Sequence, residues 1–67
     1  MNDSDFIISN DGSVWRFQPV TQRAKNFTDT ELGLESWQWL GPAFVIDANL
    51  AQQLMSSLED EGFILEL

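Results

Sequence analysis

One helix is specified by the sequence from its first residue to its last. Asp47 is a favourable N-cap, because its carboxylate can accept a hydrogen bond from a free amide of the first helical turn. Apolar residues then recur at the spacing of one helical face, and they are Leu50, Ala51, Leu54, Met55 and Leu58. Gly62 is typical of a helix end, since glycine readily adopts the left-handed conformation found there. We therefore predict an amphipathic helix between Asp47 and Gly62.

The segments on either side of this helix have the composition of strands. Residues 43–46 read Ala-Phe-Val-Ile, which is rich in strand-forming side chains. Residues 63–67 alternate in the way that a half-buried strand does. The sequence from residue 43 to residue 67 therefore predicts a β-α-β unit.

A β-hairpin is predicted over residues 6–18. Its turn is the Asn-Asp-Gly of residues 10–12, in which glycine can take a positive φ. Trp15 and Phe17 fall on one face of the second strand. Pro19 is expected to end that strand, because proline has no amide hydrogen to donate to a neighbouring strand.

The helix that follows the hairpin has two alternative starts. Thr21 can cap a helix that runs from Gln22 to about Leu32. Residues 28–31, Thr-Asp-Thr-Glu, instead match the capping-box pattern of a helix that starts later. Because Gly33 leaves too few residues for the later helix, we favour the earlier start.

Residues 33–42 are harder to assign. Trp37 and Trp39 alternate as in a strand, and a Gly-Pro pair then breaks or bends the chain. The whole chain is therefore predicted as β-β-α-β-α-β. This order is that of a single α+β domain over residues 1–67, with two helices on one face of a small sheet.

A loose pattern of turn, cap and core residues runs through most of the chain. A Gly-Ser turn and an apolar strand lead to a Pro-x-Thr helix start, and a short apolar strand that ends in an acid precedes a helix closed by Glu-Gly. The matching residues are Gly12, Ser13, Val14, Phe17, Pro19, Thr21, Ala24, Phe27, Val45, Ile46, Asp47, Glu61, Gly62 and Phe63. In this pattern the chain resembles a group of small uncharacterised bacterial proteins. The resemblance implies the fold and the earlier helix start, and it implies no activity. In such sequences an Arg and an aromatic residue often follow the acid that ends the short strand. Here Ala48 and Asn49 stand at those two positions, so we expect no role that depends on the Arg or the aromatic residue.

The chain contains no His and no Cys, which excludes several kinds of active site. Ser-His-Asp and Cys-His catalysis and His/Cys transition-metal sites all need these residues. No phosphate-binding loop motif occurs either. Paired carboxylates could support glycoside hydrolysis, but 67 residues leave little room for a cleft that buries a sugar. We therefore expect no enzyme, no catalytic residue and no cofactor.

Acidic residues dominate the charge of the chain. Eleven acids face three cations, which gives a formal net charge of −8 at pH 7. Residues 26–67 contain no Lys, Arg or His, and their eight acids are Asp29, Glu31, Glu35, Asp47, Glu59, Asp60, Glu61 and Glu66. Direct nucleic-acid binding is not expected, because it depends on Lys and Arg that neutralise phosphates. No signal peptide or membrane-spanning run is recognisable, so we expect a cytoplasmic protein that does not bind a membrane.

Two groups of residues are candidates for partner binding. Glu59, Asp60 and Glu61 lie at the end of the long helix, where acids oppose the helix dipole by about 0.3–1 kcal/mol each. They form either a selected acidic surface or a solvated helix end, and a Ca²⁺-binding role is less favoured because neighbouring helical residues diverge. Trp37 and Trp39 either pack in the core or form an exposed anchor. The candidate partner-binding residues are Glu59, Asp60, Glu61, Trp37, Trp39 and Glu35.

Two functions fit these residues. The first is a non-catalytic interaction protein that docks on a basic surface of a partner protein. In its sharpest form it is an inhibitor that imitates nucleic acid, and the chain resembles in size and charge the small phage- or plasmid-borne inhibitors of restriction or CRISPR systems. The second is a homo-oligomeric accessory or structural protein, such as a homodimer. It would associate through the Trp37–Trp39 segment or through the C-terminal strand at a sheet edge.

Overall fold

The computed structural model describes residues 4–67 and contains a five-stranded mixed sheet. The strand order is β3-β4-β2-β1-β5. The strands are β1 (Phe6–Asn10), β2 (Val14–Pro19), β3 (Trp39–Leu40), β4 (Ala43–Asp47) and β5 (Leu65–Glu66). The helices are α1 (Gln22–Phe27) and α2 (Ala48–Asp60), with the π-helical segment η1 (Thr28–Leu32) and the 3-10 turn η2 (Ser36–Gln38). Residues 1–3 of the predicted domain, which covers residues 1–67, lie outside the described residues.

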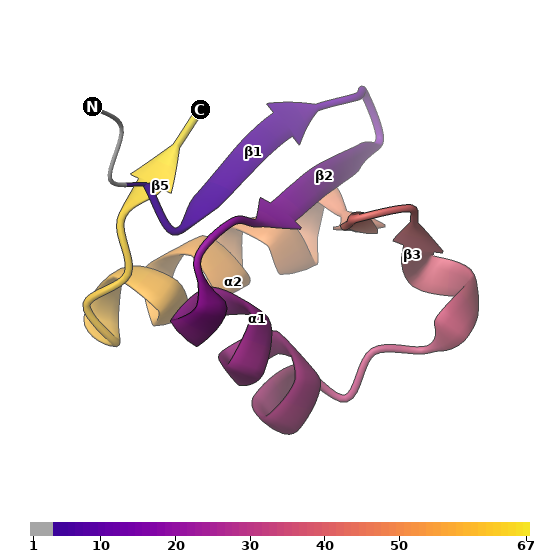
Figure 1. Ribbon diagram of the computed structural model, residues 1–67. Helices are drawn as coiled ribbons and strands as arrows, with labels where there is room; N and C mark the ends of the chain where they lie inside the picture. The colour runs from indigo at the N-terminus through magenta and orange to yellow at the C-terminus, as the bar shows by residue number, and fades with distance from the viewer. Residues whose placement is uncertain (1–3) are drawn as a thin grey trace.

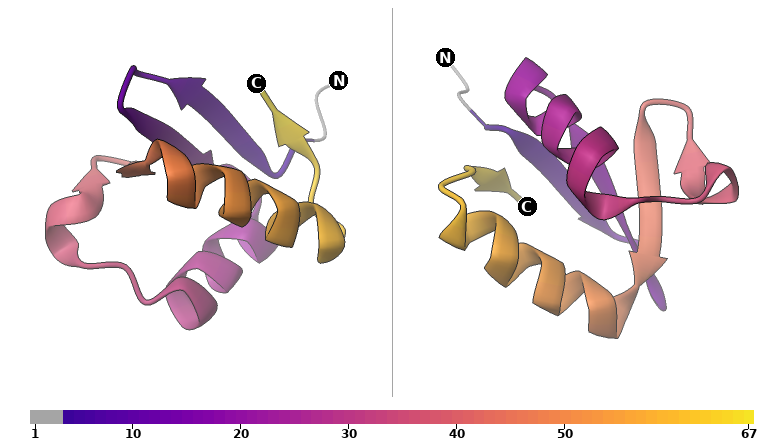
Figure 2. Two further views of the ribbon diagram at one scale, coloured as in Figure 1. Left: turned by 180° about the vertical axis from the view of Figure 1, so that it is seen from behind. Right: turned by 90° about the horizontal axis from the view of Figure 1, so that it is seen from below.

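Both α-helices lie on the same side of the sheet (Figure 1). Viewed from below, α1 and α2 stand in front of the strands, and no described helix covers the opposite face (Figure 2). The predicted α+β class, with two helices on one face of a small sheet, is confirmed.

The predicted hairpin is confirmed as the antiparallel pair β1 and β2. Its turn is closed by a hydrogen bond of 2.9 Å from the Asp11 amide to the Val14 carbonyl. The Gly12 amide donates to the Asn10 side chain at 2.9 Å, and Gly12 takes a φ of 91°. Pro19 is the last residue of β2, as the sequence predicts.

The core lies between the sheet and the helices. Ile8, Phe17 and Phe44 form one row across β1, β2 and β4, because the strand registers pair them in turn. The Phe17 and Phe44 rings stack with their centroids 5.4 Å apart. The buried apolar cluster is Phe6, Ile8, Phe17, Ala24, Phe44, Ala51 and Leu58. Each large side chain buried in this way contributes about 1.5–3 kcal/mol, so these few residues dominate the stability of so short a chain.

The earlier start of the first helix is confirmed, and the later start is wrong. The Thr21 hydroxyl accepts a hydrogen bond from the Ala24 amide at 3.2 Å, as an N-cap does. Thr28 does not cap a new helix, because its buried hydroxyl donates to the Ala24 carbonyl at 2.9 Å. The helical segment continues through Thr28 as η1 and ends at Gly33, whose φ is 56°.

The predicted long helix is confirmed as α2. The Asp47 carboxylate accepts from the Leu50 amide at 2.9 Å. At the other end Gly62 has a φ of 89°, and the Phe63 amide donates to the Leu58 carbonyl at 3.0 Å. Leu50 departs from the predicted apolar face, since it is 52% exposed.

The strand-like alternation of Trp37 and Trp39 holds for Trp39 but not for Trp37. Glu35 and Gln38 form a capping box, in which each side chain accepts a hydrogen bond from the backbone amide of the other residue. These bonds wind Ser36–Gln38 into η2, so only Trp39–Leu40 remain extended as β3. The sheet therefore gains a fifth, short strand that the predicted order lacks.

The C-terminal strand is shorter than the predicted 63–67. Asp5 bonds to Ile64 through both its amide, at 2.8 Å, and its carboxylate, at 2.9 Å, so pairing begins only at Leu65. The strand β5 is at the sheet edge, as expected, and β3 forms the other edge. The predicted β-α-β unit spans the sheet, because β2 and β1 separate β4 from β5.

Candidate functional site

An apolar hollow lies beside β4, beyond the point where β3 ends. The strand β3 pairs only with Ala43 and Phe44, so the outer edge of β4 from Val45 onward has no described strand next to it. The hollow has a volume of about 370 Å³. Its lining residues are Val14, Trp37, Gln38, Val45, Ile46, Asp47 and Leu50.

A second hollow, of about 340 Å³, continues the first along α2. The two share Gln38, Ile46 and Leu50. The second is also lined by Leu32, Leu34, Gln53, Leu54 and Ser57. We call the two hollows together the Trp37 groove. It follows α2 from Asp47 to Ser57, which is about 15 Å at 1.5 Å per helical residue.

The apolar side chains around this groove are unusually exposed. Trp37 is 73% exposed, Leu50 52% and Val14 36%. Trp39 lies only two residues from Trp37, but it is half-buried, with its ring 5.5 Å from that of Phe44 in an edge contact. Trp39 is therefore a packing residue, and Trp37 has the exposure of an anchor. Exposed apolar side chains gathered around one hollow are typical of a binding surface.

Gln38 fixes the wall of the groove that carries Trp37. Its side-chain carbonyl accepts from the Glu35 amide at 2.9 Å, and its side-chain amide donates to the Val45 carbonyl at 3.3 Å. Gln38 thus ties η2 to the outer edge of β4. Sequence reasoning missed both Gln38 and Leu50 as site residues, although the three-residue spacing of Glu35 and Gln38 was a signal for a capping box.

The ion pairs of the described residues leave most of the acids unpaired with arginine. Arg16 pairs with Asp11 and Arg23 with Asp5, each at 2.6 Å. Both partner acids belong to the first 25 residues, so the seven acids from Asp29 to Glu61 keep no arginine partner. Of these seven acids, Asp47 lines the Trp37 groove, and Glu35 precedes η2, the turn that carries Trp37.

Lys25 and Asp29, four residues apart on the chain, are not among these ion pairs of the described residues. Instead the two side chains line a hollow of about 240 Å³ together with Pro19, Trp39 and Pro42. Trp39 therefore borders a different hollow from Trp37.

The acids at the end of α2 lie apart from the Trp37 groove. Glu59, Asp60 and Glu61 are all exposed, and no basic residue occupies the last turn of α2. The end of α2 and the strand β3 stand at opposite sides of the molecule (Figure 1). The structure therefore divides the predicted site residues between two separate places. Residues 4–67 contain no group of three or more acids placed to hold a metal ion.

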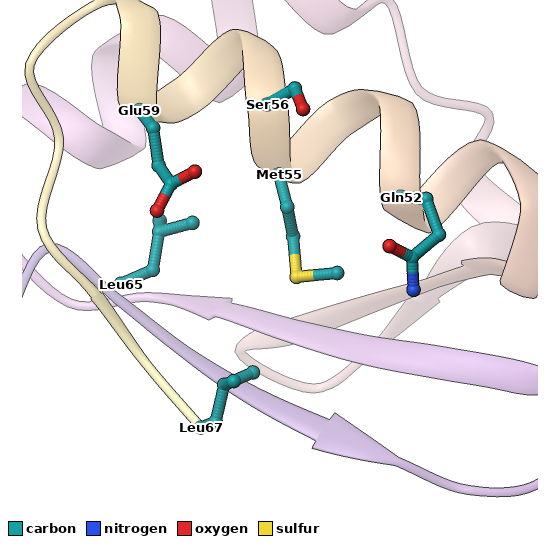
Figure 3. Close-up of a pocket in the computed structure, with 6 residues that line it drawn as sticks. All are labelled: Gln52, Met55, Ser56, Glu59, Leu65 and Leu67. Carbon is teal, nitrogen blue, oxygen red and sulfur yellow. The ribbon is translucent and has the colours of Figure 1, made fainter.

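A smaller hollow of about 230 Å³ separates α2 from the C-terminal segment. Figure 3 shows Met55 between Gln52 and Glu59 on the helix, with Leu65 and Leu67 opposite. Glu59 is the only predicted site residue in its lining. Its lining mixes apolar and polar side chains and brings no reactive groups together.

Asp5 is the most heavily bonded carboxylate in the described chain, and sequence reasoning missed it. It is 2% exposed and accepts from Arg23 at 2.6 and 3.0 Å, from the Thr21 hydroxyl at 2.6 Å and from the Ile64 amide at 2.9 Å. The hydrogen bonds from Arg23 hold the pKa of Asp5 well below its usual range, although burial opposes them. No local pattern predicts this contact, because Arg23 is 18 residues and Ile64 is 59 residues away.

Arg23 extends this bonding to the C-terminal segment. It donates to the Gly62 carbonyl at 3.0 Å, and its guanidinium lies 4.8 Å from the centre of the Phe63 ring. Asp5 and Arg23 thus join β1, α1 and the segment before β5. Because the contacts are satisfied within the chain, their role is structural.

Comparisons with protein-family models, with curated proteins and with solved structures find no match for this chain. The resemblance to a group of small bacterial proteins therefore stays a prediction. Within residues 4–67, none of the helices has the length and apolar character needed to cross a membrane.

Proposed function

We propose that this protein is a non-catalytic interaction protein that binds a basic surface of a partner protein through the Trp37 groove. One observation carries the proposal. A Trp37 side chain that is 73% exposed borders an apolar hollow whose only charged lining residue is Asp47. A partner that fits this site presents an apolar group to Trp37 and positive charge to the acids.

Trp37 and the acids are expected to contribute different amounts of binding free energy. Burying the exposed part of a Trp side chain stabilises a complex by on the order of 3 kcal/mol before the entropic cost of association. An exposed ion pair contributes only about 0–1 kcal/mol. Trp37 is therefore expected to provide affinity. The uncompensated acids are expected to increase the association rate and to select basic partners.

A sharper form of the proposal is an inhibitor that imitates nucleic acid. The carboxylates at the two ends of α2, Asp47 and Glu59 to Glu61, support it. They are about 20 Å apart along a helix of 13 residues. Carboxylates spaced in this way can occupy a groove that binds phosphates, as in inhibitors of an anti-CRISPR or anti-restriction kind. A DNA duplex should then compete with the protein for the partner, and simultaneous binding of both at saturation would overturn this form.

The alternative is a homo-oligomeric accessory or structural protein. Its support is the two edge strands, β3 and β5, each two residues long. Leu40 in β3 is 56% exposed, and Ile64 directly before β5 is 51% exposed. The net charge of −8 on each copy opposes self-association at low salt. Light scattering at high protein concentration and high salt tests this alternative, and a strictly monomeric mass under those conditions removes it.

The proposed function is tested with the natural partner. The wild-type chain and a Trp37→Ala variant are used to capture proteins from an extract of the native cells. A protein retained only by the wild type is purified, and its Kd for the wild type and for a variant with Glu59, Asp60 and Glu61 reversed to Lys is measured at low and at high salt. We expect binding that weakens with salt and with charge reversal. A Kd that is the same at both salt concentrations contradicts the proposal.

A further inference from the structure

Whether a bound partner is extended or helical depends on whether the outer edge of β4 can pair with another strand. An extended peptide could add to this edge only by pairing with the backbone from Val45 onward. The Val45 carbonyl already accepts from the Gln38 side chain, and Gln38 is itself fixed by its bond to the Glu35 amide. A strand added here would have to displace the Gln38 side chain from Val45, and only residues 45–47 of β4 remain before α2 begins, so the groove offers mainly side chains to a partner.

The length of the groove matches a short helix. The groove follows α2 for about 15 Å, and apolar anchors at positions i, i+4 and i+7 of a helix span about 10 Å. Leu50 lines both hollows, Leu54 lines the second and Trp37, on η2, lines the first. An amphipathic helix can place three successive apolar side chains along these residues.

The negative charge around the groove favours a partner helix that carries positive charge. Asp47 is the only charged residue that lines the two hollows, and Glu35 begins the turn that carries Trp37. Neither is paired with an arginine. A helix with Lys or Arg beside its apolar stripe complements both acids, whereas an acidic helix would be repelled.

We propose that the Trp37 groove binds an amphipathic α-helix whose apolar residues recur at i, i+4 and i+7 and whose flanking residues are Lys or Arg. This inference rests on the proposed function and adds the form of the partner. Trp37 fills the space between successive apolar side chains of that helix, and Asp47 and Glu35 contact its cations.

Three synthetic peptides, each about three helical turns long, test the inference. The first has Leu at helical spacing and Lys on its polar face. The second has the same composition with Leu and Lys alternating as in a strand, and the third replaces Lys by Glu in the first. Affinity is measured by fluorescence anisotropy, and helix formation by circular dichroism. We expect the first peptide to bind and to gain helix, and the others to bind at least about tenfold more weakly.

Variants of the protein show whether binding occurs in the groove. Trp37→Ala on η2 and Leu50→Gln on α2 should each weaken binding of the helical peptide by about tenfold or more. Ile64→Ala, an exposed apolar residue elsewhere, should change it less than about twofold. Asp47→Asn removes a charge but keeps a good N-cap, and should weaken binding more than Asp60→Asn does.

Two results would overturn the inference. One is a strand-forming peptide that binds as tightly as the helical one. The other is a helical peptide whose affinity is unchanged by Trp37→Ala and Leu50→Gln. Either result leaves salt-dependent binding of the natural partner intact, so the inference can fail while the proposed function stands. Salt-independent binding of the natural partner contradicts the proposed function, whatever the peptides do.

Discussion

Asp5 shows how one charged residue can be buried in a domain this small. A buried carboxylate is costly unless hydrogen bonds replace the water that it loses. Asp5 accepts such bonds from Arg23, Thr21 and the Ile64 amide. The residue therefore links the beginning and the end of the described chain through contacts that no short-range pattern encodes.

Replacing Asp5 by Asn should destabilise the fold by about 2 kcal/mol, because the charged hydrogen bonds to Arg23 are lost. Unfolding in urea measures the effect. Asp11→Asn is the matched control, since it breaks the exposed pair with Arg16, and it should cost less than about 1 kcal/mol. Equal losses for the two variants would contradict the structural role of Asp5.

The stability of the protein should depend on pH through Asp5. Folding lowers the pKa of this carboxyl, so its stabilisation is fully present above the ordinary value of 3.8. It is lost progressively as the pH falls below 3.8 towards the lowered value. Wild type should therefore lose more stability than Asp5→Asn between about pH 5 and pH 2. Parallel curves of unfolding free energy against pH would contradict the lowered pKa of the Asp5 carboxyl.

The elements that the sequence predicts well are those held by local bonds. The hairpin turn, the Thr21 cap, the Asp47 cap and the Gly62 stop each involve residues only a few positions apart. The short β5 depends on a distant contact, from Asp5 to Ile64, whereas the 3-10 turn at Trp37 is held by the local Glu35–Gln38 capping box, a signal that the strand-like alternation of Trp37 and Trp39 obscured. The same limit applies to the site, because only the packed structure separates an exposed Trp37 from a half-buried Trp39.

Two variants of Asp47 separate the stability that its hydrogen-bonded cap gives α2 from the stability that its charge gives. Asp47→Ala should lower the free energy of unfolding by about 1 kcal/mol, because the Leu50 amide loses its acceptor. Asp47→Asn should be nearly neutral, since Asn caps helices about as well as Asp. Thermal and urea unfolding measure both. If the Asn variant is destabilised as much as the Ala variant, the charge of Asp47 rather than its cap stabilises α2.

The end of α2 should show a conflict between stability and binding. Asp60→Lys places a cation at a helix C-terminus and should stabilise the fold by about 0.3–1 kcal/mol. The same change should slow association with a basic partner. Gln52→Lys, at an exposed position in the middle of α2, is the control for the dipole effect and should leave stability nearly unchanged. A destabilised Asp60→Lys variant would show that the dipole argument does not hold here.

At the scale of the whole molecule, charge and exposed apolar surface point to the same kind of partner. The two arginines pair with acids of the first 25 residues, so among the described residues the seven acids from Asp29 to Glu61 have no arginine partner. One layer of helices on one face of the sheet buries the core, yet the Trp37 groove stays open at its side. The exposure of Trp37 beside this groove is the observation on which the proposed binding rests.

The affinity of Trp37→Ala for the natural partner, compared with wild type at low and high salt, tests this account most directly. We expect the variant to bind about 30-fold more weakly at both salt concentrations, because it loses about 2 kcal/mol of apolar contact that salt does not screen. The dependence on salt should be the same for both proteins, since their acids are identical. A variant that binds as tightly as wild type would contradict the claim that the Trp37 groove is the binding site.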